Sequence, residues 1–449
     1  MGKRNREKRA AKKRARGGQG PTPPRHGGFS SAAAEDFWTP PPPMVSPELV
    51  ANELTHAAHA HASGHPSAAE DFATTFTRGR FAAATRTVAM GAGIALASVL
   101  GRLWEAGWTP ADVCEYARRN VGDEATGLLV DGIAADTAKH ASATVDERWV
   151  AQVQGIGADV WWSHDRPHFL QWAERAGVVM AQALLTVTGL LAELMTLPEL
   201  PVIVPPPGSR VARATRSARG VDQKVLGRVR GLLAKAESTQ FPEEAEALSA
   251  KAQELMNRYA FERALLDADA HRKQTASSTR MWLDAPYVEA KSHLVAAIAQ
   301  ANRCRSVFYA KLGFVALVGE EMDLEITELL TTSLLVQATH AMVAEGRHIT
   351  RTGSSRTRSF RRSFLVSYAV RIGERLAEAG SRAHDPVEDA RLLPVLTDRS
   401  RVVEETFEAM FSGALVQRSA PVSNGAGWQA GRAAADHADL TIEREAVDA

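Results

Sequence analysis

The residues best placed to do chemistry form an acidic run, Gly319-Glu-Glu-Met-Asp-Leu-Glu, where a predicted strand meets a predicted long helix. Carboxylates at the end of a strand can bind a divalent cation and activate water, as in many nucleases. On this interpretation, Glu320, Glu321 and Asp323 form the metal site of a metal-dependent nuclease or hydrolase. The same acids also complement the positive start of a helix, which needs no ligand. We favour this second interpretation, and the sequence then predicts no catalytic residue, no metal and no cofactor.

Other reactive side chains lack the partners that such sites need. Four histidines at helical spacing (His56, His59, His61 and His65) have only Glu53 near them, and no HExxH motif is present. Cys304 stands between two arginines that can lower a thiol pKa, but without a recognisable base we favour a buried strand cysteine. The chain has no P-loop and no GxGxxG, GxSxG or CxxC motif.

Arginine and lysine concentrate in three segments that are nearly free of acids: residues 1–16, residues 210–219 and residues 347–362. Cationic side chains of this kind contact the phosphates of DNA or RNA and release counterions, so such binding weakens with salt. The alternative is a solvated tail, linker and loop. The predicted nucleic-acid-binding residues are Lys3, Arg4, Arg6, Lys12, Lys13, Arg14, Arg210, Arg213, Arg216, Arg219, Arg351, Arg356, Arg358, Arg361 and Arg362.

Composition limits the class of protein. A chain of 449 residues, 45% hydrophobic and with a net charge of +1, has room for two or three domains with real cores. Its two cysteines form neither a disulfide framework nor a zinc site and suit a reducing compartment. No secretory signal is visible, and the apolar run 88–100 is too short to span a bilayer. We therefore expect a cytoplasmic protein with no membrane association.

The pattern of apolar residues predicts a mainly α protein. A basic, proline-rich tail (1–45), which we expect to be disordered, precedes a helical domain (46–196) that ends in one long apolar helix from Phe169 to Met195. Within this domain Thr109 should cap a helix that begins at Pro110. Trp161, Trp162 and Trp172, close to two histidines, form either a ligand pocket or, as we favour, aromatic anchors of the core.

A proline- and arginine-rich linker (197–221) leads to a predicted helical hairpin (222–266) and then to an α+β domain (279–441) with a small sheet. In that domain the runs 279–283, 305–310 and 313–319 are predicted strands, the last two joined as a hairpin. Residues 383–400 are predicted to form a loop with a short edge strand at 392–396, weakened by Pro394. A final helix should begin at Trp428.

The hairpin has the most regular pattern in the chain. Apolar residues recur at spacings of three and four on both sides of a turn that ends at Pro242. Its motifs, LLAKAEST and then PEEAEALSAKAQELMNRYA, resemble the bacterial and phage family known as domain of unknown function 2786. Residues 360–376 and 427–440 resemble the uncharacterised region that often follows that domain. The resemblance implies no activity, cofactor or site residue.

Taken together, the charges favour a non-catalytic nucleic-acid-associated protein. The first alternative is the metal-dependent nuclease or hydrolase at the 320–325 acids. The second is a helical adaptor that binds a protein partner or a second copy of itself through the helical domain.

Overall fold

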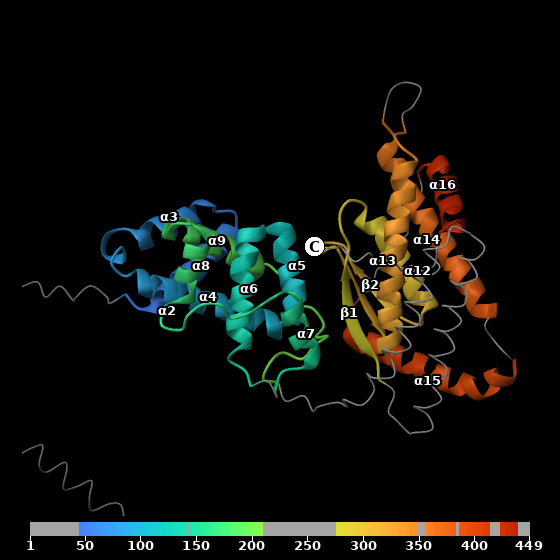
Figure 1. Cartoon of the computed structure of the whole chain (residues 1–449), viewed down its shortest axis with the longest axis horizontal. Helices are drawn as coiled ribbons and strands as arrows, with labels where there is room; N and C mark the ends of the chain where they lie inside the picture. The colour runs from blue at the N-terminus through green and yellow to red at the C-terminus, as the bar shows by residue number, and fades with distance from the viewer. Residues whose placement is uncertain are drawn as a thin grey trace, which may run out of the picture. The chain divides into compact units, whose positions relative to one another are not determined.

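The computed structural model describes residues 45–141, 144–209, 275–348, 355–382, 386–413 and 423–438. In these residues the protein is mainly helical with one small sheet, as the sequence predicted (Figure 1). The basic tail, the predicted hairpin and the arginine-rich half of the linker lie outside the described residues, and so does Arg351.

The N-terminal helices pack around one apolar core whose largest fully buried side chains include Trp108 and Trp149. α2 packs against α4 and α9, and α3 also lies on α9. Their bounds are α2 (Pro47–Ala62), α3 (Ser67–Thr77), the 3-10 turn η1 (Gly79–Phe81), α4 (Thr85–Glu105), α5 (Pro110–Asn120), α6 (Asp123–Thr137), α7 (Glu147–Gly155), α8 (His168–Ala176) and α9 (Met180–Met195).

The predicted single helix from Phe169 to Met195 is wrong: α8 and α9 meet at an angle of 107°. Gly177 ends α8 in the left-handed conformation, with φ of 70°, and Val179 then begins α9 from an extended backbone. A glycine at this position terminates a helix even within an apolar run. The bend lets both helices bury an apolar face in the same core.

α4 is 21 residues long and apolar enough to cross a membrane, and the bent pair α8 and α9 passes the same test of length and composition. In the fold, however, α4 buries Val88, Leu96 and Leu100 among the other N-terminal helices. By this burial α4 is a core helix of the N-terminal part of the fold. The first part of the predicted linker also packs on this core, because Leu200 and Val204 are buried there.

The sheet has three antiparallel strands in the order β1-β3-β2, with bounds β1 (Ser277–Trp282), β2 (Arg305–Tyr309) and β3 (Phe314–Gly319). The predicted hairpin of the second and third runs is confirmed. β3 is buried throughout, so both faces of the sheet are covered. Phe314 and Ala316 join the N-terminal core, whereas Val315 and Leu317 face the C-terminal helices.

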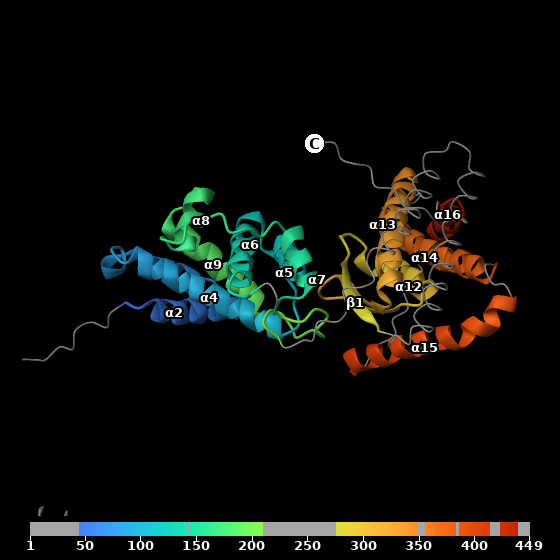
Figure 2. The ribbon, with the colours of Figure 1, turned by 60° about the horizontal axis from the view of Figure 1, so that its bottom comes forward.

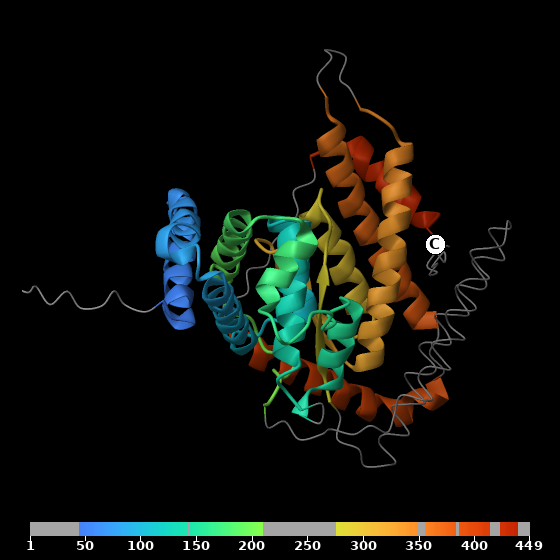
Figure 3. The same ribbon diagram turned by 60° about the vertical axis from the view of Figure 1, so that its left-hand side comes forward.

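α12, α13, α14 and α16 gather on one side of the sheet, as Figures 1 and 2 show, and Figure 3 shows the strands in yellow from a further direction. α15 lies apart from them, because its Val403 and Phe407 pack against Val318, on the face of β3 that also carries Phe314 and Ala316. α14 packs closely against both α12 and α16. Gly427 and Gly431 allow this approach, since a Cβ at either position would collide with a backbone carbonyl of α14. The bounds are α12 (Val288–Ala301), α13 (Glu321–Ala344), α14 (Thr357–Arg382), α15 (Pro386–Met410) and α16 (Gly425–Asp436).

The predicted loop and edge strand at 383–400 are wrong, because α15 runs from Pro386 to Met410 and passes through Pro394. Proline is tolerated in the first turn of a helix, as Pro386 is at the start of α15. The interior Pro394 does not end the helix. The last helix also begins three residues earlier than expected, with Asn424 capping it by accepting from the Gly427 N–H.

The expected side-chain cap of α5 is also absent. Thr109 occupies the N-cap position, but its hydroxyl donates to the Asp112 carboxylate at 2.7 Å instead of accepting a backbone N–H. Asp112 is buried and accepts further hydrogen bonds from Arg280 and Trp282 of the sheet. The Thr109 hydroxyl therefore helps to satisfy this buried carboxylate.

Candidate nucleic-acid interface

The acidic run at 320–325 is held by structural contacts. Glu320 accepts a hydrogen bond from the Met322 N–H at 3.1 Å and so caps α13, which is the interpretation that we favoured from sequence. Asp323 is buried and paired in a two-point contact with the Arg303 guanidinium, with an Nη2–Oδ1 distance of 2.5 Å. Within the described ranges, no group of three or more histidines, cysteines or acids is placed to hold a metal ion.

Cys304 lies just before β2 and is buried. Burial raises the pKa of its thiol to about 12, and the negative charge of Asp323 adds to this effect. The thiol donates to the Asn302 carbonyl at 3.4 Å. The neighbouring arginines therefore do not activate it, and the buried interpretation from sequence is confirmed.

The tryptophan cluster mainly anchors the core. Trp162 and Trp172 are buried, whereas Trp161 is 39% exposed and donates its indole N–H to Asp131 at 2.9 Å. The other oxygen of Asp131 lies 3.1 Å from His168 Nε2. These contacts hold the 159–167 segment onto α6, and they use the polar groups that a ligand would otherwise contact.

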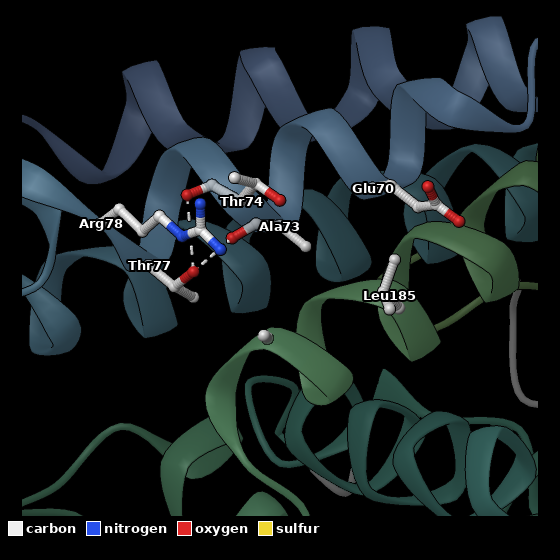
Figure 4. Close-up of a pocket in the computed structure, with 7 residues that line it drawn as sticks. Glu70, Ala73, Thr74, Thr77, Arg78 and Leu185 are labelled. Atoms are coloured by element: carbon white, nitrogen blue, oxygen red, sulfur yellow. Dashed lines mark hydrogen bonds between the residues drawn. The ribbon is translucent and has the colours of Figure 1, made fainter.

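A groove of about 320 Å³ lies between α3 and α9. Figure 4 shows Glu70 and Arg78 at opposite ends of the labelled residues, with Ala73 and Thr74 between them. Glu70, Thr74 and Arg78 are exposed to solvent, and the Thr77 hydroxyl is used internally, because it donates to the Ala73 carbonyl. The groove thus lacks a buried polar group that would orient a ligand.

The start of α14 carries the predicted arginines that the structure describes. Arg356 and Arg358 are exposed and make no ion pair with any described residue. Arg361 is half-buried, and its Nε atom has no hydrogen-bond partner in the described chain. Arg362 forms an ion pair with Glu289 on α12, with 2.9 Å between Nη2 and Oε2. The structure thus brings together four of the fifteen predicted residues, of which three remain available to a ligand.

Arg347, after the end of α13, belongs to the arginine-rich segment 347–362 identified in the sequence, and its side chain is exposed. One further feature of this corner was missed from sequence. His348 stacks its ring on Phe360 with 3.5 Å between ring centroids. Its carbonyl accepts from the Arg356 N–H at 2.8 Å, and its N–H donates to the Thr357 hydroxyl at 3.1 Å. No sequence signal links His348 to Phe360, because the two are twelve positions apart across a loop.

The electrostatics of the two long helix starts differ. α13 begins with Glu321 and Asp323 after its capping glutamate, as the helix dipole favours. α14 has no acid in its first turn and carries Arg358 there instead. The N–H groups of Thr357, Arg358 and Ser359 have no acceptor among the described residues, since the first helical bond is donated by the Phe360 N–H. Positive charge and N–H groups without an acceptor among the described residues therefore meet at the start of α14.

One histidine lies next to this corner. His293 on α12 is half-buried, and burial lowers its pKa, against the opposing effect of the nearby Glu289. Arg362 lowers it further. His293 therefore adds no charge here at neutral pH, and the positive charge comes from the arginines.

Comparison with known proteins gives little beyond the sequence resemblance. No curated protein and no solved structure matches the chain. One family model matches, over residues 224–263, which lie outside the described residues. The resemblance found in the sequence is thereby confirmed: this segment matches the family described as Protein of unknown function (DUF2786).

Proposed function

We propose that the protein is a non-catalytic, nucleic-acid-associated protein that contacts phosphates through the start of α14. The observation that carries this proposal is the set of exposed arginines Arg347, Arg356 and Arg358, which have no carboxylate partner among the described residues. Phosphate is the common biological anion that arginine binds with two parallel hydrogen bonds. An exposed group of unpaired arginines is therefore a natural contact for a nucleic-acid backbone.

Some exposed arginines elsewhere in the fold are paired with acids, whereas others, such as Arg86 and Arg102, have no ion pair among the described residues. Arg118 pairs with Glu115 one helical turn away, and Arg401 pairs with both Asp398 and Glu405. What sets the start of α14 apart is that Arg347, Arg356 and Arg358 lie close together in the chain and none pairs with a described acid, so positive charge collects there and attracts polyanions.

The basic tail and the arginines of the linker extend this proposal. Neither segment is described, so their contribution rests on charge alone: residues 1–16 contain many lysines and arginines with a single glutamate. If all three segments contact phosphates, affinity should depend steeply on salt concentration, because each contact releases counterions.

The test is fluorescence anisotropy of the full chain with labelled single-stranded RNA and double-stranded DNA, at salt concentrations from about 50 to 200 mM. We expect Arg356→Gln with Arg358→Gln to weaken binding roughly tenfold or more and to reduce the salt slope by about 1.4 to 1.8. The matched control, Arg118→Gln with Arg401→Gln, removes the same charge from arginines that are already paired. Equal losses from both pairs, or binding that ignores salt, would overturn the proposal.

The adaptor interpretation stays a prediction. Large apolar side chains are exposed on several elements, among them Met90 and Ile94 on α4 and Val336 and Val343 on α13. Nothing among the described residues shows what would cover them, and a protein partner or a homodimer is untested.

A further inference from the structure

We propose that two copies of the chain bind each other through the open side of α4, with the two α4 helices antiparallel about a two-fold axis. This side carries two large and two small apolar residues, with one charged residue at each end. In chain order they are Arg86, Met90, Ile94, Ala97, Gly101 and Glu105, which we call the α4 face. The inference is independent of the proposed function, because it concerns a different part of the fold and a protein partner.

The α4 face is apolar, and the described residues leave it open. α4 has a mean hydropathy of 1.4 over 18 residues, yet only 56% of that stretch is buried. The other sides of the helix lie in the N-terminal core, whereas Met90 is 44% exposed and Ile94 is 41% exposed. A helix that is apolar on all sides is normally covered on all sides. The α4 face is therefore suited to contact with another protein surface.

No packing contact in the described fold explains Gly101, which sets it apart from Gly91 on the same helix. A Cβ at Gly91 would collide with Val50 and with the Pro47 carbonyl of α2, so Gly91 lets the two helices approach. A Cβ at Gly101 would meet nothing within 4 Å. Glycine destabilises the interior of a helix, so a glycine on an open helix face is expected where a further chain comes close.

The order of large and small residues fits a second copy in one orientation. The six positions of the α4 face are spaced 4, 4, 3, 4 and 4, so the spacing is the same from either end. In an antiparallel pair centred on this stripe, Met90 lies over Gly101 of the second copy, and Ile94 lies over Ala97. Each large side chain then meets a small residue, and the two-fold axis repeats the contact. A parallel pair would instead place Met90 against Met90 and Gly101 opposite Gly101.

The charges at the ends of the α4 face favour the same orientation. Arg86 and Glu105 are both exposed, and neither forms an ion pair with a described residue. Arg86 donates only to the Asp165 carbonyl, at 3.1 Å, which leaves its charge without a counter-charge. The antiparallel pair sets Arg86 opposite Glu105 of the second copy at both ends, whereas a parallel pair would bring like charges together. Charge complementarity thus selects a second copy of this chain as the partner.

The expected dimer is reversible. One pair of helices covers less surface than the roughly 1,200 Å² of lasting protein complexes. Exposed ion pairs at its ends also add little affinity. We therefore expect a dissociation constant on the order of micromolar, so that association depends on protein concentration.

The main test is sedimentation velocity of the full chain from about 1 to 300 μM, where we expect a monomer–dimer equilibrium. Gly101→Gln should weaken the dimer at least about tenfold, because the new side chain occupies the space that Met90 of the second copy needs. The same variant should not lower Tm, because the position is open and glycine is a poor helix residue. The matched control is Gly189→Gln on α9, where a Cβ also meets nothing within 4 Å, and it should leave the dimer unchanged.

Two results of this test would overturn the inference. A chain that stays monomeric at every concentration would show that a second copy does not cover the α4 face. A dimer that both glycine variants weaken equally, or that neither weakens, would show that the chains associate elsewhere.

Cysteine cross-linking tests the orientation. Met90→Cys combined with Gly101→Cys should give a disulfide between chains under mild oxidation. Within one helix these positions are about 16 Å apart, too far for a bond inside the chain. Met90→Cys alone should not cross-link, because the two copies of residue 90 are equally far apart in the antiparallel pair. The native Cys114 and Cys304 are buried and should not interfere. Cross-linking by Met90→Cys alone would contradict the antiparallel pair.

A charge exchange tests the register at low salt. Glu105→Arg should weaken the dimer severalfold, because the new arginine faces Arg86 of the second copy. Adding Arg86→Glu to this variant should restore the dimer, since the opposite charges then meet again with their signs exchanged. A double variant that associates as weakly as Glu105→Arg would show that Arg86 and Glu105 do not face each other.

Discussion

Asp112 and Arg280 form a buried ion pair, with 2.6 Å between Asp112 Oδ2 and Arg280 Nη1, that joins α5 to strand β1. Asp112 also accepts from the Trp282 indole and the Thr109 hydroxyl. Arg280 donates further to the carbonyls of Gly107 and Pro201. Both carboxylate oxygens of Asp112 and both terminal nitrogens of Arg280 are therefore hydrogen-bonded. The N-terminal helices and the sheet are fastened by one satisfied polar network as well as by the shared apolar core around Phe314.

The first prediction concerns this pair. Asp112→Ala leaves the Arg280 guanidinium buried without its counter-charge, and we expect a loss of about 3 to 5 kcal/mol in the free energy of unfolding. The measurement is urea denaturation followed by circular dichroism. Glu115→Ala, which breaks the pairs with exposed Arg118 and partly buried Arg119, should cost about 1 kcal/mol or less. Similar losses from both variants would show that the buried network does not hold the two parts together.

The second prediction concerns the 65 residues between 209 and 275. Just before this segment, the Gly208 N–H donates to the Thr144 carbonyl. Just after it, the Arg148 guanidinium donates to the Ser277 hydroxyl. Thr144 and Arg148 are four positions apart beside the start of α7, so the described residues that flank 210–274 lie near each other. Replacing 210–274 with a short Gly/Ser linker should therefore change Tm by less than about 4 °C.

The same deletion removes Arg210, Arg213, Arg216 and Arg219, and we expect it to weaken oligonucleotide binding while the fold persists. The measurement is differential scanning calorimetry together with the anisotropy assay. A deletion variant that fails to fold would show that residues 210–274, which include the segment that matches the family model, supply part of the core.

Much of the architecture could be predicted because its signals are local. The two β-prone runs at 305–310 and 313–319, separated by a short turn, predicted the β2–β3 hairpin, and the acids at 320–325 predicted the start of α13. The failures arose where one residue opposed a longer pattern. Gly177 divides an apolar run that reads as one helix, and Pro394 lies inside a helix that it was expected to prevent.

The candidate site could be predicted only in part, for a physical reason. The density of arginine at 347–362 is visible in the sequence, but which arginines are neutralised depends on contacts between distant residues. Arg362, for example, is neutralised by Glu289, which lies 73 positions away in the sequence. Likewise, nothing local links Asp112 to Arg280, which are 168 positions apart. Such pairings follow from tertiary packing, which a single sequence does not display.

The third prediction concerns the two thiols. Cys114 and Cys304 are buried, and burial raises the pKa of each to about 12. At pH 8 only about one thiol in ten thousand is then ionised, and the thiolate is the reactive form. A colorimetric thiol assay on the folded protein should give almost no signal, whereas the protein in urea should give two thiols. Fast reaction of one thiol in the native state would contradict its burial.

The fourth prediction concerns Glu328, a half-buried acid on α13 that accepts from the Thr279 hydroxyl of β1 at 2.8 Å. Burial raises its pKa above the ordinary value of 4.5. The unfolded chain releases this proton near pH 4.5, whereas the folded protein holds it to higher pH, so stability falls as pH rises from there through the folded-state pKa. Glu328→Gln mimics the protonated form and keeps the acceptor. It should raise Tm at pH 7 but not at pH 4, and a uniform change at both pH values would show that ionisation plays no part.

The fifth prediction sets stability against binding at the start of α14. Arg358 occupies the first turn, where the helix dipole favours a negative charge. Arg358→Glu should therefore stabilise the folded protein by up to about 1 kcal/mol in urea denaturation at low salt, and the same variant should weaken oligonucleotide binding. The control is Arg118→Glu, which reverses an equally exposed arginine that is already paired with an acid and should destabilise slightly. If Arg358→Glu lowers both the free energy of unfolding and the affinity for oligonucleotides, Arg358 supports the fold. The prediction that it destabilises the helix start and binds an anion there would then be wrong.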